Sequence, residues 1–208
     1  YAVLNLAVLG VAWFRPWRAL NLVGFLFTFV IGAAWGAKYY RPELFYSVEP
    51  FLVGFFLFYL AIPLFYALRT REQSRGFVDS TLVFGTPLLA FPLQAALLVD
   101  DRMGLAWSAL LVSAIYALLG AVLIRREGMR LLAQSFAVLA AGFASVAVPL
   151  ALSSRWTSAV WALQGAALVW LGLRQQRLLP KLAGWLLQLL AAGAYMVSVV
   201  DGGWDPQV

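Results

Sequence analysis

Long apolar segments recur along the chain, and short polar stretches separate them. Most segments approach the ~20 residues that an α-helix needs to cross a bilayer at a rise of ~1.5 Å per residue. The first segment is the shortest. The pattern predicts an all-α, polytopic transmembrane bundle with about eight spans, at Tyr1–Phe14, Ala19–Ala37, Pro50–Leu68, Val78–Val99, Met103–Ile124, Met129–Leu152, Trp156–Leu173 and Pro180–Val200.

The connecting loops are too short to fold by themselves. The longest predicted loop runs from Lys38 to Glu49. Residues 1–208 are therefore expected to form a single transmembrane domain. Because Tyr1 already lies inside an apolar run and is not an initiator Met, we expect the chain to be a piece of a longer multi-span protein.

The basic residues alternate between the loops. By the positive-inside rule, the loop set that is richer in Lys and Arg faces the cytoplasm. This assignment predicts that both ends of the chain face outward. The richer set holds Arg15, Arg18, Arg69, Arg71, Arg75, Arg125, Arg126, Arg130, Arg174, Arg177 and Lys181, and the poorer set holds Lys38, Arg41, Arg102 and Arg155.

Composition agrees with a membrane domain and excludes several kinds of chemistry. Hydrophobic residues make up 63% of the chain and charged residues 12%, whereas soluble domains are about a quarter charged. The chain has no Cys and no His, which excludes thiolate nucleophiles, imidazole bases and most zinc sites. We expect no cofactor. The net charge of +6 does not indicate nucleic-acid binding, because the basic residues lie at helix ends.

The fourth span carries most of the candidate pathway residues. Asp79 is either an N-cap of this helix or a proton or cation site near its mouth. Proline removes a backbone donor, so Pro87 and Pro92, together with Gly85, predict a kink. Broken helices form binding sites in transporters, but kinks also occur in inert spans. The amide of Gln94 completes this group.

Other polar positions allow a packing and a ligand-binding interpretation. Amides in hydrocarbon need partners, so interhelical hydrogen bonds are expected, with ligand contact as the alternative, for Gln94, Gln134, Gln164 and Gln188. Gly32 and Gly36 form a GxxxG pattern that favours close helix packing. Asp100 and Asp101 are expected to form a turn and an N-cap rather than a paired-carboxylate site.

The outer loop that begins at Lys38 concentrates charge and aromatic rings. Lys38 and Arg41 are interpreted either as interfacial cations that reach toward the lipid headgroups or as a headgroup and phosphate site. Eight of the nine Trp residues lie near predicted span ends, as expected of an interfacial aromatic belt. Trp161 is the exception and lies deeper in its span.

Several stretches resemble a family of very large bacterial membrane proteins that is catalogued only as a domain of unknown function. They are WRALNLVGF (Trp17–Phe25), YYRPEL (Tyr39–Leu44), VDSTLVFGTPLLAFPLQAAL (Val78–Leu97), GLAWSAL (Gly104–Leu110) and RWTSAVWALQGAALVWLGLRQ (Arg155–Gln175). The resemblance implies many more spans than eight in the parent protein. It also implies a Glu in the family where this chain has Gln164. It implies no established activity.

Three functional hypotheses remain at this stage. The leading one is a non-enzymatic, multi-pass domain of the bacterial inner membrane that acts as a scaffold or as part of a transport path in the cell envelope. Its expected partners are membrane lipids and further transmembrane helices, and no nucleic acid. The alternatives are a small-solute or ion transporter that uses the kinked fourth span, and a membrane enzyme acting on lipid-linked envelope precursors. The enzyme would bind phosphate through Lys38 and Arg41 and use Glu43 or Glu49 as a base.

Overall fold

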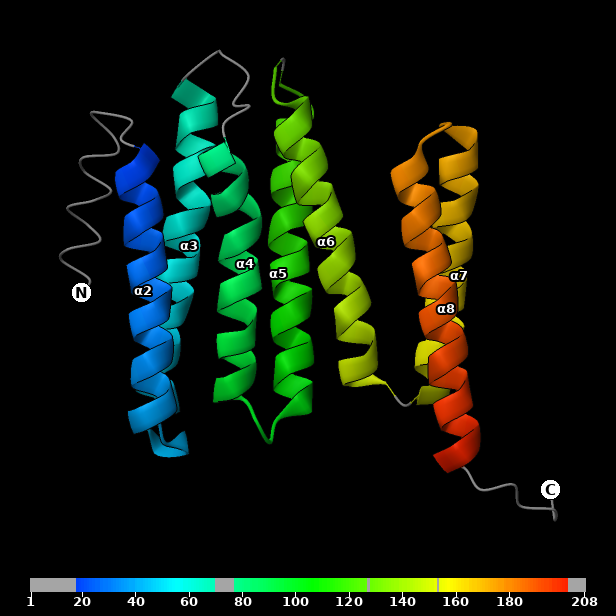
Figure 1. Ribbon diagram of the computed structural model, residues 1–208, viewed down its shortest axis with the longest axis horizontal. Coiled ribbons are helices and arrows are strands. Elements are labelled where there is room, and N and C mark those ends of the chain that lie inside the picture. The colour runs from blue at the N-terminus through cyan, green and yellow to red at the C-terminus, as the bar shows by residue number, and fades with distance from the viewer. Residues whose placement is uncertain (1–17, 70–76, 127, 153, 202–208) are drawn as a thin grey trace. The chain divides into compact units, whose positions relative to one another are not determined.

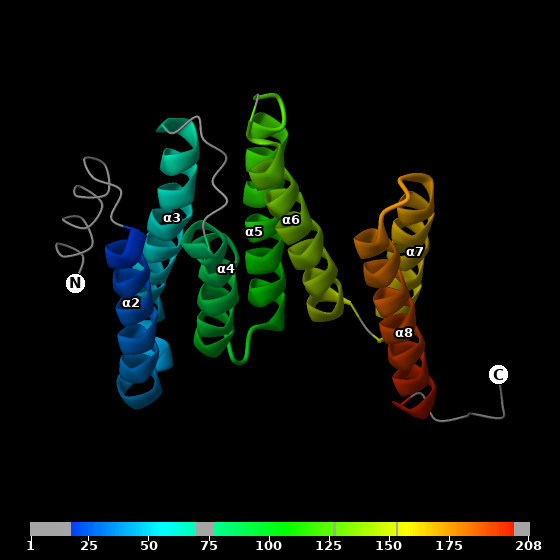
Figure 2. The ribbon, with the colours of Figure 1, turned by 45° about the horizontal axis from the view of Figure 1, so that its top comes forward.

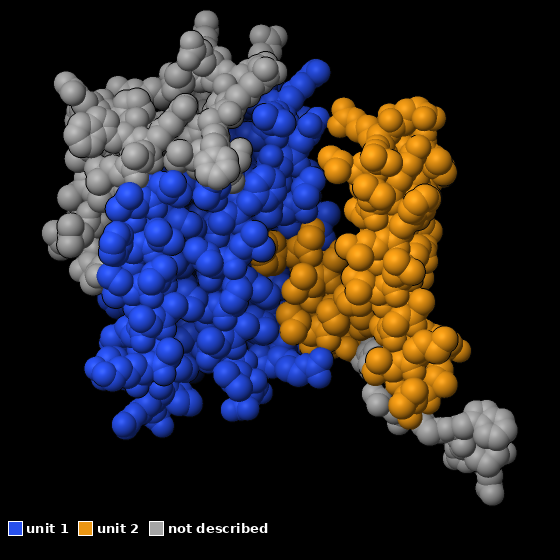
Figure 3. All heavy atoms as spheres, in the orientation of Figure 1, with its two compact units in different colours: residues 1–141 blue, residues 142–208 orange. Residues whose placement is uncertain are grey.

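The computed structural model describes residues 18–69, 77–126, 128–152 and 154–201, and its regular elements there are all helices (Figure 1). The chain divides into two compact units, Tyr1–Ala141 and Gly142–Val208, coloured separately in Figure 3. The elements are α2 (Arg18–Tyr39), the 3-10 helix η1 (Pro42–Leu44), α3 (Phe45–Arg69), α4 (Phe77–Leu97), α5 (Arg102–Leu123), α6 (Arg130–Ala151), α7 (Ser154–Arg174) and α8 (Leu178–Asp201).

The helices confirm an all-α protein with several membrane spans. Six described segments are long and apolar enough to cross a bilayer. Helix α4 adds a shorter apolar segment, Thr81–Leu97. The first predicted span, Tyr1–Phe14, lies outside the described residues. The direction in which the spans cross the membrane stays a prediction. The six segments are Asn21–Tyr39, Pro42–Phe65, Arg102–Leu123, Arg130–Ala151, Trp156–Arg174 and Leu178–Val200.

The long loop predicted from Lys38 to Glu49 is wrong. Helix α2 continues to Tyr39, and η1 leads directly into α3 at Phe45. Pro50, which suggested a helix start, lies inside α3. Membrane helices tolerate an interior proline, which removes one intrahelical bond, so the apolar residues before Pro50 can still be helical. This shift places Glu49 within a candidate span instead of a loop.

Aromatic side chains form the core of the first unit. Tyr59 of α3 is fully buried and meets the rings of Phe25 and Phe29 of α2 at centroid distances of 5.3 and 5.9 Å. The Tyr59 hydroxyl shares a hydrogen bond of 3.1 Å with the hydroxyl of Thr28. Both ribbon views show α2 beside α3 (Figures 1 and 2). Edge-to-face and tilted ring contacts and a satisfied buried hydroxyl are the interactions expected where no water is present.

Close backbone packing joins α5 to the first half of α6. Gly120 of α5 lies against the backbone of α6, because a Cβ built there would be 3.3 Å from the carbonyl oxygen of Ala133. The Ser113 hydroxyl donates to the carbonyl oxygen of Ala140 at 2.7 Å. Small residues permit this approach, and a hydroxyl on one span then reaches the backbone of the next.

In the second unit, two glycines bring α7 and α8 into backbone contact. A Cβ built on Gly184 would be 2.7 Å from the carbonyl oxygen of Gly165, and one built on Gly165 would be 2.8 Å from that of Gly184. The GxxxG pair of α2 behaves differently. No described atom lies within 4 Å of a Cβ at Gly32 or Gly36, so the packing expected there is not formed inside the described chain.

Candidate functional site: polar bonds between spans

A carboxylate, an amide and a hydroxyl from α3, α4 and α5 meet in the first unit. The Nε2 of Gln94 donates to the carboxylate of Glu49 at 2.9 Å and, more weakly, to the hydroxyl oxygen of Ser108 at 3.4 Å. Ser108 in turn donates to the carbonyl oxygen of Gly104 at 3.0 Å. Gln94 is buried, with 8% of its surface exposed. Both amide hydrogens of this residue therefore bind neighbouring helices.

A second bond ties the end of α2 to the end of α4. The hydroxyl of Tyr40 donates to the carbonyl oxygen of Leu97, the last residue of α4, at 2.8 Å. The final carbonyl groups of a helix have no intrahelical donor, so this bond satisfies one of them. Burial raises the pKa of the Tyr40 phenol above its ordinary value of 10.0, and the charges of Glu43 and Glu49 raise it further. The phenol therefore keeps its proton, and this bond, at neutral pH.

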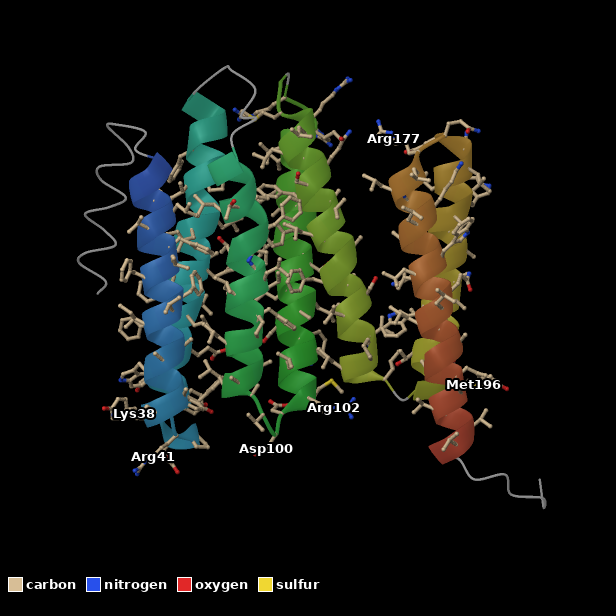
Figure 4. The ribbon with its side chains drawn as sticks, viewed as in Figure 1. Lys38, Arg41, Asp100, Arg102, Arg177 and Met196 are labelled. Carbon is tan, nitrogen blue, oxygen red and sulfur yellow. The ribbon has the colours of Figure 1, made fainter. Side chains whose placement is uncertain are left out.

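The turns at this end of the first unit carry charged side chains. Figure 4 shows Lys38, Arg41, Asp100 and Arg102 at the same end of the unit. Asp101 is the N-cap of α5, and one of its carboxylate oxygens accepts from the backbone N–H of Gly104 at 2.7 Å. The predicted turn and N-cap are therefore confirmed.

Lys38 and Arg41 have different surroundings in the part of the chain that the structure describes. The Lys38 ammonium lies over the ring of Tyr39 at 5.2 Å. Arg41 is exposed and precedes η1 without a side-chain capping bond. A cation over an aromatic ring at the end of a span is typical of an interfacial anchor. Their role in headgroup or phosphate binding stays a prediction.

Helix α4 turns its buried face toward the other helices of the first unit. A Cβ on Gly85 would lie 3.2 Å from the ring of Phe25, so this glycine packs against α2. Thr86 and Pro87 are fully buried, and the Thr86 hydroxyl donates to the carbonyl of Leu82 at 2.7 Å. Pro92 is exposed. The backbone of Asp79 belongs to the first turn of α4, but its side chain lies outside the described residues.

The second unit has its own polar contact, which involves a proline. Pro149 of α6 has no N–H, so it cannot donate to the carbonyl of Ser145 four residues earlier. The indole N–H of Trp161 in α7 donates to that carbonyl at 3.0 Å. The Ser145 hydroxyl donates to Oε1 of Gln164, also in α7, at 3.1 Å. Membrane helices tolerate proline where a neighbouring helix satisfies the freed carbonyl in this way.

These contacts show what sequence reasoning found and what it missed. Gln94 and Gln164 form the interhelical bonds expected of them, and Gln188 donates to the carbonyl of Ala162 at 3.0 Å. The partnership of Glu49 with Gln94 was missed, because Glu49 was assigned to a loop. The partner of Trp161 was also missed. Two features of the sequence could have indicated this partner. Trp161 lies too deep in its span for an interfacial indole, and the preceding span contains Pro149, which leaves a carbonyl without its helical donor.

The family model described as "Predicted membrane protein (DUF2339)" matches residues 1–204. The chain belongs to this family. The DUF2339 chain is thus a multi-pass integral membrane protein, and the function of its family is unknown. No curated protein and no solved structure matches it.

Proposed function

We propose that this DUF2339 chain is a non-enzymatic domain of the bacterial inner membrane, which acts as a scaffold or as a component of a transport path in the cell envelope. Its two ends face outward in this proposal, as the distribution of Lys and Arg favours. Its partners are membrane lipids and further transmembrane helices of the parent chain or of other subunits.

The bonding of Gln94 is the observation that carries the proposal. This residue is one of the candidate pathway residues of the fourth span, and its amide hydrogens point to Glu49 on α3 and Ser108 on α5. A polar group in hydrocarbon is costly without a partner, and an interhelical bond removes that cost. The amide therefore serves to hold helices together. The side chains of Trp161 and Gln164 bind neighbouring helices in the same manner.

The outward surface of the second unit fits the proposed partners. Large apolar side chains on α8 are strongly exposed, among them Leu179 (80%), Leu189 (72%) and Val200 (79%). Contiguous apolar surface of this kind needs lipid or another apolar helix around it.

Cysteine accessibility separates a packed scaffold from a transporter. The chain has no native Cys, so each introduced thiol reports by itself. Thr86→Cys and Ala90→Cys probe the buried face of α4, where the native residues are 0% and 6% exposed. Leu88→Cys is the matched control on the exposed face of the same helix, at 65%. Asp101→Cys and Arg126→Cys, at turns predicted to lie on opposite sides, report on orientation.

The scaffold proposal expects a charged thiol reagent, applied to membranes that contain the parent protein, to leave both buried positions unlabelled. A membrane-soluble maleimide should label Leu88→Cys, which shows that the thiol on α4 is reactive when a reagent reaches it. Labelling of Thr86→Cys and Ala90→Cys by the charged reagent would place water beside α4 and contradict the packed arrangement.

The transporter is the second candidate, and one observation favours it. Glu49 is a carboxylate inside a candidate span, and ionisable groups at such positions often mark ion or proton pathways. Its partner Gln94 lies on a helix that contains two prolines. The labelling of α4 from water described above is the result that this function requires.

A further inference from the structure

We propose that the turn between α7 and α8 is a binding site for the phosphate group of an anionic phospholipid. Two candidate spans end there, because one closes at Arg174 and the next opens at Leu178. Figure 4 shows Arg177 at this end of the hairpin, with Met196 toward the other. The turn therefore lies at the level of the lipid headgroups, where phosphate is the most abundant anion.

The charge at this turn has no acidic counterpart nearby in the chain. Arg174, Arg177 and Lys181 lie within eight positions of one another, and no Asp or Glu occurs between Gly142 and Val200. The turn between α5 and α6 differs, because Glu127 lies between its arginines. Cations that have no acidic residue near them in the sequence are available to an external anion, and Lys and Arg near a membrane surface attract anionic lipids.

The backbone of the turn holds these cations in a defined geometry. The N–H of Arg177 donates to the carbonyl of Gly172 at 3.0 Å, and the N–H of Gln176 donates to that of Leu173 at 3.3 Å. This pair of bonds is a Schellman motif, and Gln176 occupies its left-handed position with φ 52°. Glycine is the usual residue at that position, because a side chain is disfavoured there.

Two further contacts fix the side chains at the surface. The guanidinium of Arg174 lies over the ring of Trp170 at 5.4 Å, a cation–π contact that holds the cation at the depth of an interfacial indole. The stem of Lys181 fits against Gly172, since a Cβ built on that glycine would be 2.6 Å from the Cγ of Lys181. Any larger residue in place of Gly172 would displace this lysine.

Exposed leucines beside the cations indicate a lipid instead of a free anion. Leu178 and Leu179 are 68% and 80% exposed at the start of α8, and Leu173 is 53% exposed at the end of α7. An acyl chain covers such surface while the phosphate binds the adjacent cations.

Lipid titration of the full chain in neutral detergent, followed by native mass spectrometry, tests the site. The probes are phosphatidylglycerol and phosphatidylcholine with identical acyl chains. The variant Arg174→Gln/Arg177→Gln/Lys181→Gln removes the cations of the proposed site. The matched control Arg125→Gln/Arg126→Gln/Arg130→Gln removes the same charge from the turn between α5 and α6. Gln176→Gly keeps every charge and checks that the turn can be changed without loss of the site.

We expect wild type and Gln176→Gly to bind phosphatidylglycerol at least about tenfold more tightly than phosphatidylcholine. Each removed cation should weaken phosphatidylglycerol binding roughly fivefold, and all three about a hundredfold. The control variant should change the affinity for phosphatidylglycerol by less than about threefold. Equal losses in the two triple variants, or no preference for phosphatidylglycerol, would overturn the proposal.

Two arms guard against misinterpretation. If the triple variant does not fold, two single variants test the same site. Arg177→Gln should bind phosphatidylglycerol about fivefold more weakly than wild type, and Arg177→Lys, which keeps the charge, should retain the affinity. Inorganic phosphate at the lipid concentration should not displace phosphatidylglycerol. If it does, the site binds the free anion and the assignment to lipid is wrong.

Discussion

Replacing Trp161 with Phe should destabilise the second unit by an amount that depends on Pro149. The indole N–H is the donor to the Ser145 carbonyl, at 3.0 Å, and Phe removes it while keeping an aromatic ring. A buried carbonyl without a donor costs about 1–3 kcal/mol, whereas interhelical bonds measured in membranes average about 0.6 and reach about 1.7 kcal/mol. We therefore expect a loss of about 1–2 kcal/mol, part of which is lost packing.

The double variant with Pro149→Ala isolates the hydrogen bond from the packing. Alanine at position 149 restores the backbone N–H that bonds to Ser145 along the helix, so the indole is no longer needed as a donor. In that background Trp161→Phe should cost only the packing contribution. The coupling free energy between the two changes should be about 1 kcal/mol, above the ~0.3–0.5 kcal/mol scatter of independent sites.

Reversible unfolding in mixed detergent and dodecyl sulfate micelles, followed by far-ultraviolet circular dichroism, measures the four free energies of this cycle. Trp156→Phe is the matched control, because Trp156 lies in the same helix and is 64% exposed. It should show no coupling to Pro149→Ala. If Trp161→Phe costs the same free energy with Pro149 and with Ala at that position, the indole does not satisfy the freed carbonyl and the reasoning is refuted.

Three further predictions concern the packing of the spans and the ends of α2 and α4. Gly184→Ala should destabilise the chain by about 1–3 kcal/mol in the same unfolding assay, because its Cβ would lie 2.7 Å from a backbone carbonyl oxygen. The control Gly193→Ala should not destabilise the chain, because the space around Gly193 is open. Equal losses of stability in the two variants would contradict the contact at Gly184. Gln94→Leu should cost about 1.5–3 kcal/mol by leaving a carboxylate without its donor, and Gln134→Leu, at an exposed position, should be close to neutral. The raised pKa of Tyr40 means that its bond stabilises the fold fully below pH 10 and is lost as the pH rises through the folded-state value. Tyr40→Phe should remove this part of the alkaline loss of stability, and an unchanged dependence of the unfolding free energy on alkaline pH would contradict the assignment.

The apolar spans could be predicted closely from the sequence, with one informative error. Helix ends agreed to within a few residues for most spans, and Asp101 capped α5 as expected. The start of α3 was wrong because Pro50 reads as a helix start, while Phe45 and the residues after it are helical too. Local propensity could not show that Glu49 has a partner on another helix, and a charge without a visible partner was assigned to a loop.

The packing partners within the bundle could not be predicted. Gly32 and Gly36 carry the GxxxG motif, yet the close backbone contacts described above form at Gly120, Gly165 and Gly184, which belong to no GxxxG pair. Gly85 is a candidate pathway residue whose contact with the ring of Phe25 no local pattern marks. A helix presents several small-residue faces, and the rotation that its neighbours impose selects which of them is used.

The sequence by itself determined that this protein is a multi-pass helical membrane protein and where most of its described spans lie. Those properties depend on the length and apolarity of continuous segments, because each span must satisfy its own backbone in hydrocarbon. Only the tertiary structure decided that Gln94 binds Glu49 and that Trp161 binds the carbonyl freed by Pro149. Those bonds join residues on different helices, and hydropathy along a chain carries no information about which helices meet or which of their faces touch.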